Sequence, residues 1–443
     1  MLRKDHPSGS RAAPNCSCRG PRSRRRTGPR EVPVFQERSR TIPRALVKGP
    51  LPLLGPAFVT AIAYVDPGNF ATNLTAGSTY GYLLVWVVVV SNLMAMLIQY
   101  LSAKVGIATG LSLPALCREH FPRPVTRGLW VQAEAVAIAT DLAEVVGGAL
   151  ALKLLFGLPL LVGGTITAAV AFALLVLQTK GHRPFEVAIT GLLAVILIGF
   201  LYDVARSGLE PLAIASGTVP RLDGPDSLLL ATGMLGATVM PHAIYLHSAL
   251  TSRRYARRTE PQRRALLSSQ RADVVTAMTI AGVMNLLLLV VAAAALRGGA
   301  PVDTIEGAHA AFGASLGSGA ALLFALALLA SGFAASSVGT LAGQVVMEGF
   351  LRRHLPLVLR RLVTLAPALV VLAIGVDPTR ALVVSQVVLS FGIPFALVPL
   401  VLFTRRADLM GTLVNRRLTT LVASAVAAVI IALNLVLLQQ TLL

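Results

Sequence analysis

Apolar residues in this chain fall into long runs of about 20, the length a helix needs to cross the hydrocarbon layer of a membrane. Short amphipathic repeats are scarce, and strict alternation of apolar and polar positions, which a transmembrane β-barrel requires, is not the pattern. The pattern predicts an all-α polytopic membrane protein with eleven transmembrane helices, at about 51–78, 82–106, 129–154, 159–178, 184–203, 227–249, 273–296, 309–348, 358–375, 380–403 and 418–439.

Two of these runs are interrupted by residues that a spanning helix does not favour. In the first run, AIAYVDPGNFATN, Pro67 removes a backbone hydrogen bond and disfavours helix at the preceding Asp66, and Gly68 follows. In the sixth run, GATVMPHAIYLHSAL, Pro241 has the same effect. Freed backbone groups at this depth are tolerated only where they line a cavity or are buried in protein. Broken helices in matching places of two halves indicate the midplane binding site of a transporter.

The distribution of basic residues predicts an N-terminal arm and the membrane topology. Residues 1–48 are rich in Arg, Pro, Ser and Gly, so we expect a disordered basic arm, followed by a transporter domain over 49–443. With the N-terminus in the cytoplasm, the cytoplasmic segments hold 33 of the 39 Lys and Arg residues and the opposite loops hold five. This bias predicts a cytoplasmic N-terminus and a periplasmic or extracellular C-terminus. Because the basic residues lie in loops and in the arm, the net charge of +19 does not indicate nucleic-acid binding.

We expect the transporter domain to consist of two repeats and one extra helix. The first repeat covers about 51–203, the second about 227–403, and the extra helix about 418–439. The eighth run is too long for one perpendicular crossing and carries glycine pairs four residues apart, Gly313 with Gly317 and Gly339 with Gly343. We expect these to allow close packing in one tilted helix that extends past the bilayer.

The third run contains a stripe of acidic residues. Glu134, Asp141 and Glu144 lie at positions i, i+7 and i+10, within about 80° on one face of a helix. Acidic side chains on a membrane helix rarely face lipid, so the stripe indicates either a proton route or a structural ion-pair network. His242 titrates near neutral pH when unperturbed and is a candidate proton relay, with packing or gating as the other interpretation.

The two interrupted runs also carry a family resemblance. DPGN at Asp66–Asn69 and MPH at Met240–His242, together with ATDLAE at Ala139–Glu144, resemble the signature motifs of the Nramp (natural resistance-associated macrophage protein) family. The likeness runs from about residue 50 to 440 and is greatest to the bacterial members with eleven helices. It implies a leucine-transporter-like fold, a 5+5 inverted repeat with helices 1 and 6 broken. It also implies proton-coupled import of divalent transition metals.

Carried over position by position, the resemblance implies a metal site. Its ligands are the side chains of Asp66, Asn69 and Met240 and the carbonyl oxygens of Ala63 and Ala237. A carboxylate, amide and carbonyl oxygens and one thioether suit Mn²⁺ or Fe²⁺, and also Cd²⁺, better than Ca²⁺ or Mg²⁺, which take oxygen-only shells. Taken singly, Met is often a core residue and Asn often caps a helix. A lone carboxylate in mid-membrane needs a compensating role.

The resemblance further implies a proton pathway and a gate. The proton pathway includes Asp66, His242, Glu134, Asp141 and Glu144, with Arg360 and Arg361 as partners on the ninth helix. Gln386 is implied as an outer gate and transient metal contact. For His247 and Asn285, polar residues in apolar runs, interhelical hydrogen bonding is the expected role.

Other functions are alternatives to metal transport. A sodium-coupled symporter for an organic solute has the same architecture but has no need of a thioether beside the carboxylate. An intramembrane metalloenzyme is disfavoured, because the sequence has no H-E-x-x-H motif and no clustered histidines. A receptor that does not transport, or a homologue that has lost transport, is also compatible with the sequence, although the complete ligand set argues against loss of function. We therefore expect a transporter of the cell (inner) membrane, not an enzyme, with no cofactor, whose partners are divalent metal ions, protons and lipid and which has no obligate protein partner.

Overall fold

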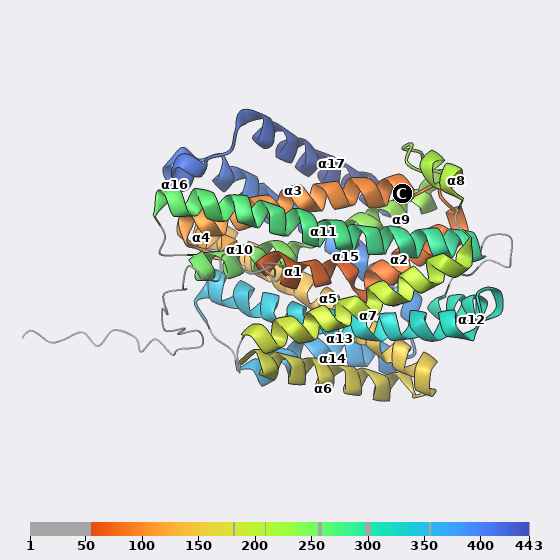
Figure 1. Ribbon diagram of the computed structural model, residues 1–443. Coiled ribbons are helices and arrows are strands. Elements are labelled where there is room, and N and C mark those ends of the chain that lie inside the picture. Colours follow the sequence, from red (N-terminus) through yellow and green to blue (C-terminus); the bar gives the residue numbers. More distant parts are fainter. Residues whose placement is uncertain are drawn as a thin grey trace, which may run out of the picture. The chain divides into compact units, whose positions relative to one another are not determined.

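The computed structural model describes residues 55–179, 182–208, 210–255, 259–296, 302, 304–353 and 356–442. The predicted basic arm, 1–48, lies outside the described residues. Within them every regular element is helical (Figure 1). The helices are α1 Pro56–Ala61, the 3-10 helix η2 Ile62–Val65, α2 Pro67–Tyr80, α3 Val85–Thr109, α4 Leu113–His120, α5 Arg123–Phe156, α6 Leu160–Thr179, α7 His182–Ser207, α8 Pro211–Ser216, α9 Gly224–Thr238, α10 Pro241–Tyr255, α11 Glu260–Leu296, α12 Ile305–Ser315, α13 Ser318–Leu351, α14 Leu357–Ala373, α15 Pro378–Thr404, α16 Ala407–Met410, the 3-10 helix η3 Gly411–Leu413 and α17 Arg417–Leu442.

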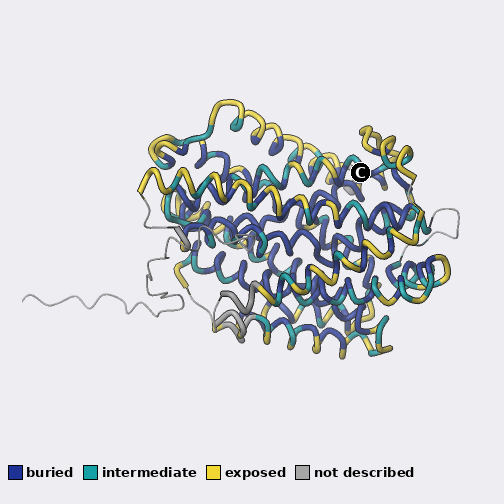
Figure 2. Tube along the Cα trace, viewed as in Figure 1, coloured by how far each residue is buried: buried dark blue, intermediate teal, exposed yellow. Residues whose placement is uncertain are grey.

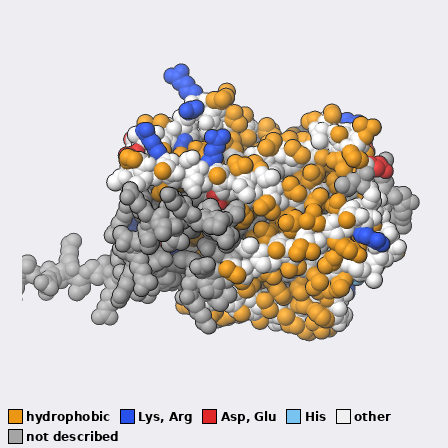
Figure 3. Space-filling model, in the orientation of Figure 1, with side chains coloured by type: hydrophobic (Ala, Val, Ile, Leu, Met, Phe, Trp, Pro, Cys, Tyr) orange, Lys and Arg blue, Asp and Glu red, His pale blue; other side chains and the backbone are white. Residues whose placement is uncertain are grey.

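Among the described helical segments, eight are long and apolar enough to cross a membrane: Val85–Thr109, Arg123–Phe156, Val187–Ser207, Gly224–Arg253, Glu260–Leu296, Ser318–Leu351, Pro378–Thr404 and Arg417–Gln439. Two shorter apolar helices, Pro56–Val65 and Leu160–Leu174, accompany them. Large hydrophobic side chains are exposed along many of these helices and cover much of the face seen in Figure 3. Exposed apolar surface of this extent fits a lipid environment, so the predicted all-α polytopic membrane fold is confirmed at this level.

The helices pack side by side around the two interrupted segments. Helix α13 packs on α5 and α7, α11 packs on α2 and α3, and α15 packs on α5 and α9. Figure 2 shows α2, α9 and α10 buried along nearly their whole length, whereas α6 and α17 are exposed on one side. Small residues permit the closest contacts: the position of a Cβ on Gly332 of α13 lies 3.0 Å from the Gly148 backbone of α5.

The first interruption follows the rules that predicted it. Helix α1 tightens into η2, and at Asp66 the backbone is extended, with φ −88° and ψ 167°. Pro67 then begins α2, where its missing N–H is not needed. The break frees carbonyl groups that other helices satisfy: Ser331 Oγ donates to Val65 O at 2.6 Å and Asn285 Nδ2 to Tyr64 O at 2.7 Å. The irregular backbone is thus buried in protein, as its depth requires.

The second interruption separates α9 from α10. Val239 ends α9 with φ −103° and ψ 77°, and Pro241 begins α10 two residues later. Val239 and Met240 between the two helices are fully buried. In Figure 1, α1 and α2 follow one another near the centre of the bundle, and α9 contacts α2.

The eighth run differs from the prediction. The single tilted helix expected over 309–348 is wrong: α12 ends at Ser315, and α13 begins at Ser318 after Gly317, whose φ of 99° suits glycine and few other residues. The second pair of glycines does serve close packing. A Cβ at Gly339 would lie 2.8 Å from Glu144 Oε1, and one at Gly343 would lie 2.2 Å from Arg360 Nη2.

Candidate metal site

Asn69 joins the two broken segments. Its Nδ2 donates both to Asp66 Oδ1, at 2.8 Å, and to the carbonyl oxygen of Ala237, at 2.9 Å, on α9. Its backbone N–H donates to the same Asp66 oxygen at 2.9 Å, so Asp66 also caps the start of α2. Asp66 and Asn69 are each 1% exposed. Three of the predicted ligands therefore meet in one buried place.

Gln386 brings α15 to the same place. Its Nε2 lies 3.5 Å from Asp66 Oδ2, and the side chain occupies the space beside Gly68, where a Cβ would be 1.8 Å from Nε2. The approach of α15 to α9 depends on Gly236, because a Cβ there would be 2.0 Å from the Gln386 carbonyl oxygen. The predicted gate residue therefore lies directly against the carboxylate of the site.

Two buried amide oxygens near the first break accept no hydrogen bond within the described part of the chain. Asn69 Oδ1 and Gln386 Oε1 are buried without a hydrogen bond among the described residues, although buried polar atoms are nearly always paired. Met240 is fully buried in the second break, and Ala63 is buried in η2 of the first. A carboxylate and an amide oxygen at the first helix break and a thioether at the second are the kinds of ligand that the family resemblance implies for a divalent transition metal.

The site differs from the usual protein metal clusters. No group of three or more His, Cys, Asp or Glu side chains placed to hold a metal occurs in the described part of the chain. A structural or catalytic zinc site uses such ligands. The ligand set that the resemblance implies contains a single carboxylate, that of Asp66.

Glu134, the first residue of the acidic stripe, pairs with α14. Arg360 donates to both carboxylate oxygens of Glu134, at 3.2 and 2.9 Å, and Trp130 Nε1 donates at 3.2 Å. The Arg360 side chain is 4% exposed and that of Glu134 17% exposed. Two parallel N–H···O bonds are the strong form of this pairing.

Asp141 and Glu144 form the deeper part of the stripe. Arg361 donates to Asp141 at 3.0 Å and to Thr340 Oγ1 at 2.6 Å, and it also bonds Ser336. Glu144 lies close enough for its charge to interact with those of Asp141, Arg361 and Asp66, yet its Oε2 has no partner among the described residues. Asp141 is thus held in an ion pair, and Glu144 is left with an open oxygen.

The stripe adjoins the first break. A Cβ at Gly147, one turn beyond Glu144 on α5, would lie 2.1 Å from Pro67 Cβ, so the break packs directly on this helix. His242, on α10, places Nδ1 3.3 Å from Thr140 Oγ1, next to Asp141, and its Nε2 has no described partner. His242 therefore lies between the second break and the acidic stripe.

A second buried polar chain was not predicted. Gln99 donates to the Tyr64 hydroxyl, and His247 Nδ1 is 2.7 Å from Gln99 Oε1. Gln270 Nε2 lies 3.4 Å from His247 Nε2 and donates to Asp273 at 2.7 Å. The interhelical bonding expected of His247 is confirmed. The signal for the rest was present, since Gln99 is a polar residue inside an apolar run.

Asn285 also has the expected interhelical role. Besides its bond to Tyr64 O, its Oδ1 accepts from Asn73 Nδ2 at 3.1 Å. Together these bonds tie α11 to both sides of the first break.

A bundle of membrane helices with two broken segments that meet at one buried carboxylate defines a secondary transporter. Comparison with known proteins agrees. The family model "natural resistance-associated macrophage protein-like" matches residues 57–440. The chain belongs to the Nramp family.

Its relatives include proteins named divalent metal cation transporter MntH. The one from Bacillus subtilis (strain 168) is 49% identical over 420 residues, covering 93% of this chain and 99% of the relative. The one from Deinococcus radiodurans is 51% identical over 386 residues, covering 87% and 88%.

Solved structures give the same result. The Eremococcus coleocola manganese transporter, in complex with an aromatic bis-isothiourea substituted compound, matches with a TM-score of 0.76 and 34% identity over 87% of this chain and 85% of that one. Mhp1, a nucleobase-cation-symport-1 family transporter, matches with a TM-score of 0.55 and 17% identity over 86% and 91%, which is a likeness of fold alone.

Proposed function

We propose that this chain imports divalent transition-metal ions, Mn²⁺ or Fe²⁺ and also Cd²⁺, in symport with protons. As a member of the Nramp family it is a transporter of metal ions and not an enzyme. It acts without a cofactor or an obligate protein partner, in the cell (inner) membrane.

The observation that carries the proposal is the bridge made by Asn69. One amide nitrogen holds Asp66 on the first broken segment and Ala237 O on the second, while the amide oxygen stays unpaired. A cation entering here would bind the carboxylate, the open amide oxygen, the Met240 sulfur and the carbonyls of Ala63 and Ala237. Because both segments supply ligands, the cation draws the two halves of the bundle together.

The proton takes a separate route in this proposal. Asp66 carries a proton before the cation binds and releases it on binding. Glu144, which is close enough to Asp66 for their charges to interact, and His242 each have an unpaired polar atom that could accept it. From Glu144 the proton passes to Asp141 and on to Glu134, with Arg361 and Arg360 holding these acids in place. The two paths diverge at Asp66, which lets metal and proton cross without competing for one channel.

The finer architecture belongs to the same proposal. We take the described helices as eleven crossing segments in a 5+5 inverted repeat, with α17 as the extra one. The Lys and Arg bias gives a cytoplasmic N-terminus. In that orientation the connection between α15 and α17 faces the cytoplasm.

The experiment is uptake into proteoliposomes that contain a pH dye. Mn²⁺, Fe²⁺ and Cd²⁺ should each enter with internal acidification, and Ca²⁺ and Mg²⁺ should do neither. A sodium gradient should not drive uptake, whereas a proton gradient should. Uptake driven by sodium with no change of internal pH would instead identify the sodium-coupled symporter of the same architecture.

A further inference from the structure

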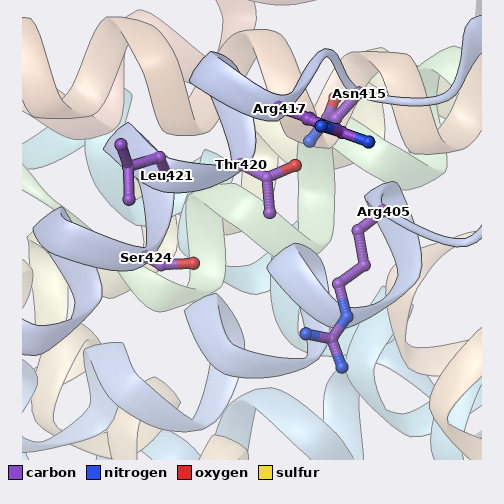
Figure 4. A pocket seen from close by; sticks show the side chains of 6 residues that line it. All are labelled: Arg405, Asn415, Arg417, Thr420, Leu421 and Ser424. Atoms are coloured by element: carbon purple, nitrogen blue, oxygen red, sulfur yellow. The ribbon is translucent and has the colours of Figure 1, made fainter.

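A basic pocket of about 420 Å³ lies where α15 and α17 meet, well outside the metal site. It is lined by Arg405, Asn415, Arg417, Thr420, Leu421 and Ser424 (Figure 4). Thr420 and Ser424 are one turn apart on α17 and turn their hydroxyl groups to the side on which Arg405 lies (Figure 4). Pockets of about 300–1,000 Å³ are the size that holds small-molecule groups.

The pocket carries positive charge without an anion to balance it. Among the described residues neither Arg405 nor Arg417 forms a salt bridge, in contrast to the neighbouring Arg406, which pairs with Asp408. Both side chains belong to exposed residues, so water partly screens their charges, but the excess of positive charge around one cavity favours a negatively charged occupant.

Asn415 adds a donor that has no acceptor. Lys104 Nζ donates to Asn415 Oδ1 at 2.7 Å, which fixes the orientation of the amide. Asn415 Nδ2 is then buried and has no hydrogen-bond partner among the described residues. An unpaired buried amide donor that lines the same pocket as two guanidinium groups points to an oxyanion, since these three groups donate hydrogen bonds and cannot accept them.

The pocket also opens toward lipid. Leu418 and Leu421, in the first turns of α17, are 69% and 67% exposed. From Arg417 to Ser424 the helix rises about 10 Å, so the lining runs from charged residues to hydroxyl groups and apolar surface, as the headgroup and glycerol region of a lipid does.

We propose that this pocket binds a phosphate group, with the headgroup of an anionic membrane lipid as its source. The phosphate lies between Arg405 and Arg417 and accepts from Asn415 Nδ2, while the hydroxyls of Thr420 and Ser424 bond the glycerol region. In the orientation proposed above the pocket faces the cytoplasmic leaflet, where basic side chains meet anionic lipids. The site is independent of the transported metal.

The test is native mass spectrometry of the whole protein in neutral detergent, titrated with phosphatidylglycerol, with phosphatidylcholine of the same chains, or with inorganic phosphate. We expect selective retention of phosphatidylglycerol. The double variant Arg405→Gln/Arg417→Gln should bind it about twenty-five-fold more weakly, about fivefold for each arginine. Arg264→Gln, which removes an exposed charge outside the pocket, should bind as the parent does.

The controls separate the sources and guard against misfolding. The charge-preserving Arg405→Lys/Arg417→Lys should retain most of the binding, and it carries the test together with Arg405→Gln if the double glutamine variant does not fold. Inorganic phosphate bound in place of lipid, and lost in the same variants, would support the phosphate site and assign it to a soluble anion. Equal retention of phosphatidylglycerol by the parent and a folded glutamine variant, or no preference over phosphatidylcholine, would overturn the proposal.

Discussion

Replacing Arg361 by glutamine should strongly destabilise the protein, because Asp141 depends on it. The Arg361 and Asp141 side chains are 3% and 4% exposed, and Arg361 also bonds Thr340 and Ser336. Removing one partner of a buried pair leaves an uncompensated charge and costs about 3–5 kcal/mol. The second variant, Arg361→Gln/Asp141→Asn, removes the charge on both sides. It should lose only the remaining hydrogen bonds, at about 1 kcal/mol each.

The assay is unfolding of the detergent-solubilised variants, treated as a double-mutant cycle. The neighbouring pair supplies the matched control, since Glu134 is 17% exposed and can reach water when Arg360 is replaced. Arg360→Gln should therefore cost less than Arg361→Gln. The reasoning is refuted if Arg360→Gln and Arg361→Gln are equally stable. It is also refuted if adding Asp141→Asn to Arg361→Gln does not restore stability.

Three further results are expected. Met240→Ala should lower Cd²⁺ affinity most and keep slower Mn²⁺ uptake. It should also let millimolar Ca²⁺ or Mg²⁺ compete, because water can then complete an oxygen-only shell; a variant that still rejects both would make Met240 a packing residue. Asp141→Asn and Glu144→Gln should each reduce metal-linked proton movement, followed with a pH dye, more than Mn²⁺ binding, and unchanged acidification in both would make the stripe structural. Gly236→Ala places a Cβ 2.0 Å from the Gln386 carbonyl and should cost about 1–3 kcal/mol by forcing α9 from α15; a thermal melt that does not move would contradict that close approach.

The two helix breaks could be predicted because proline acts locally. Pro67 and Pro241 remove a backbone hydrogen bond whatever surrounds them, and both breaks are present. The break at Gly317 was missed because glycine has no single local meaning. The spacing of Gly317 four residues after Gly313 is equally compatible with close helix packing, and only the structure shows that Gly317 has a positive φ.

The residues of the candidate site could be named from the sequence, whereas their contacts could not. Nothing in the sequence says that Asn69 reaches Ala237, 168 residues away, or that Arg361 pairs with Asp141 while Arg360 pairs with Glu134. Those pairings depend on how α14 packs on α5, a property of tertiary structure. The residues of a motif can be recognised individually in the sequence, whereas their hydrogen-bond and ion-pair partners lie on helices that are distant in the sequence.

The buried polar chain from Tyr64 to Asp273 shows the same limit. Gln99 and His247 could be noticed as polar residues in apolar runs, whereas Gln270 lies in the polar segment before the seventh run; in each case the sequence does not identify the partner on the neighbouring helix. Only the packing of α3, α10 and α11 joins Gln99, His247 and Gln270 into one chain.

The central claim, that Asp66 supplies the charge that holds the metal, is tested most directly by calorimetric titration of Asp66→Ala with Mn²⁺. The variant should fold, since it loses one helix cap worth about 1 kcal/mol together with a buried carboxylate. Asp226→Ala, which removes an exposed carboxylate, is the matched control and should bind as the parent does. The account predicts no measurable Mn²⁺ heat for Asp66→Ala, and an affinity close to that of the parent would contradict it.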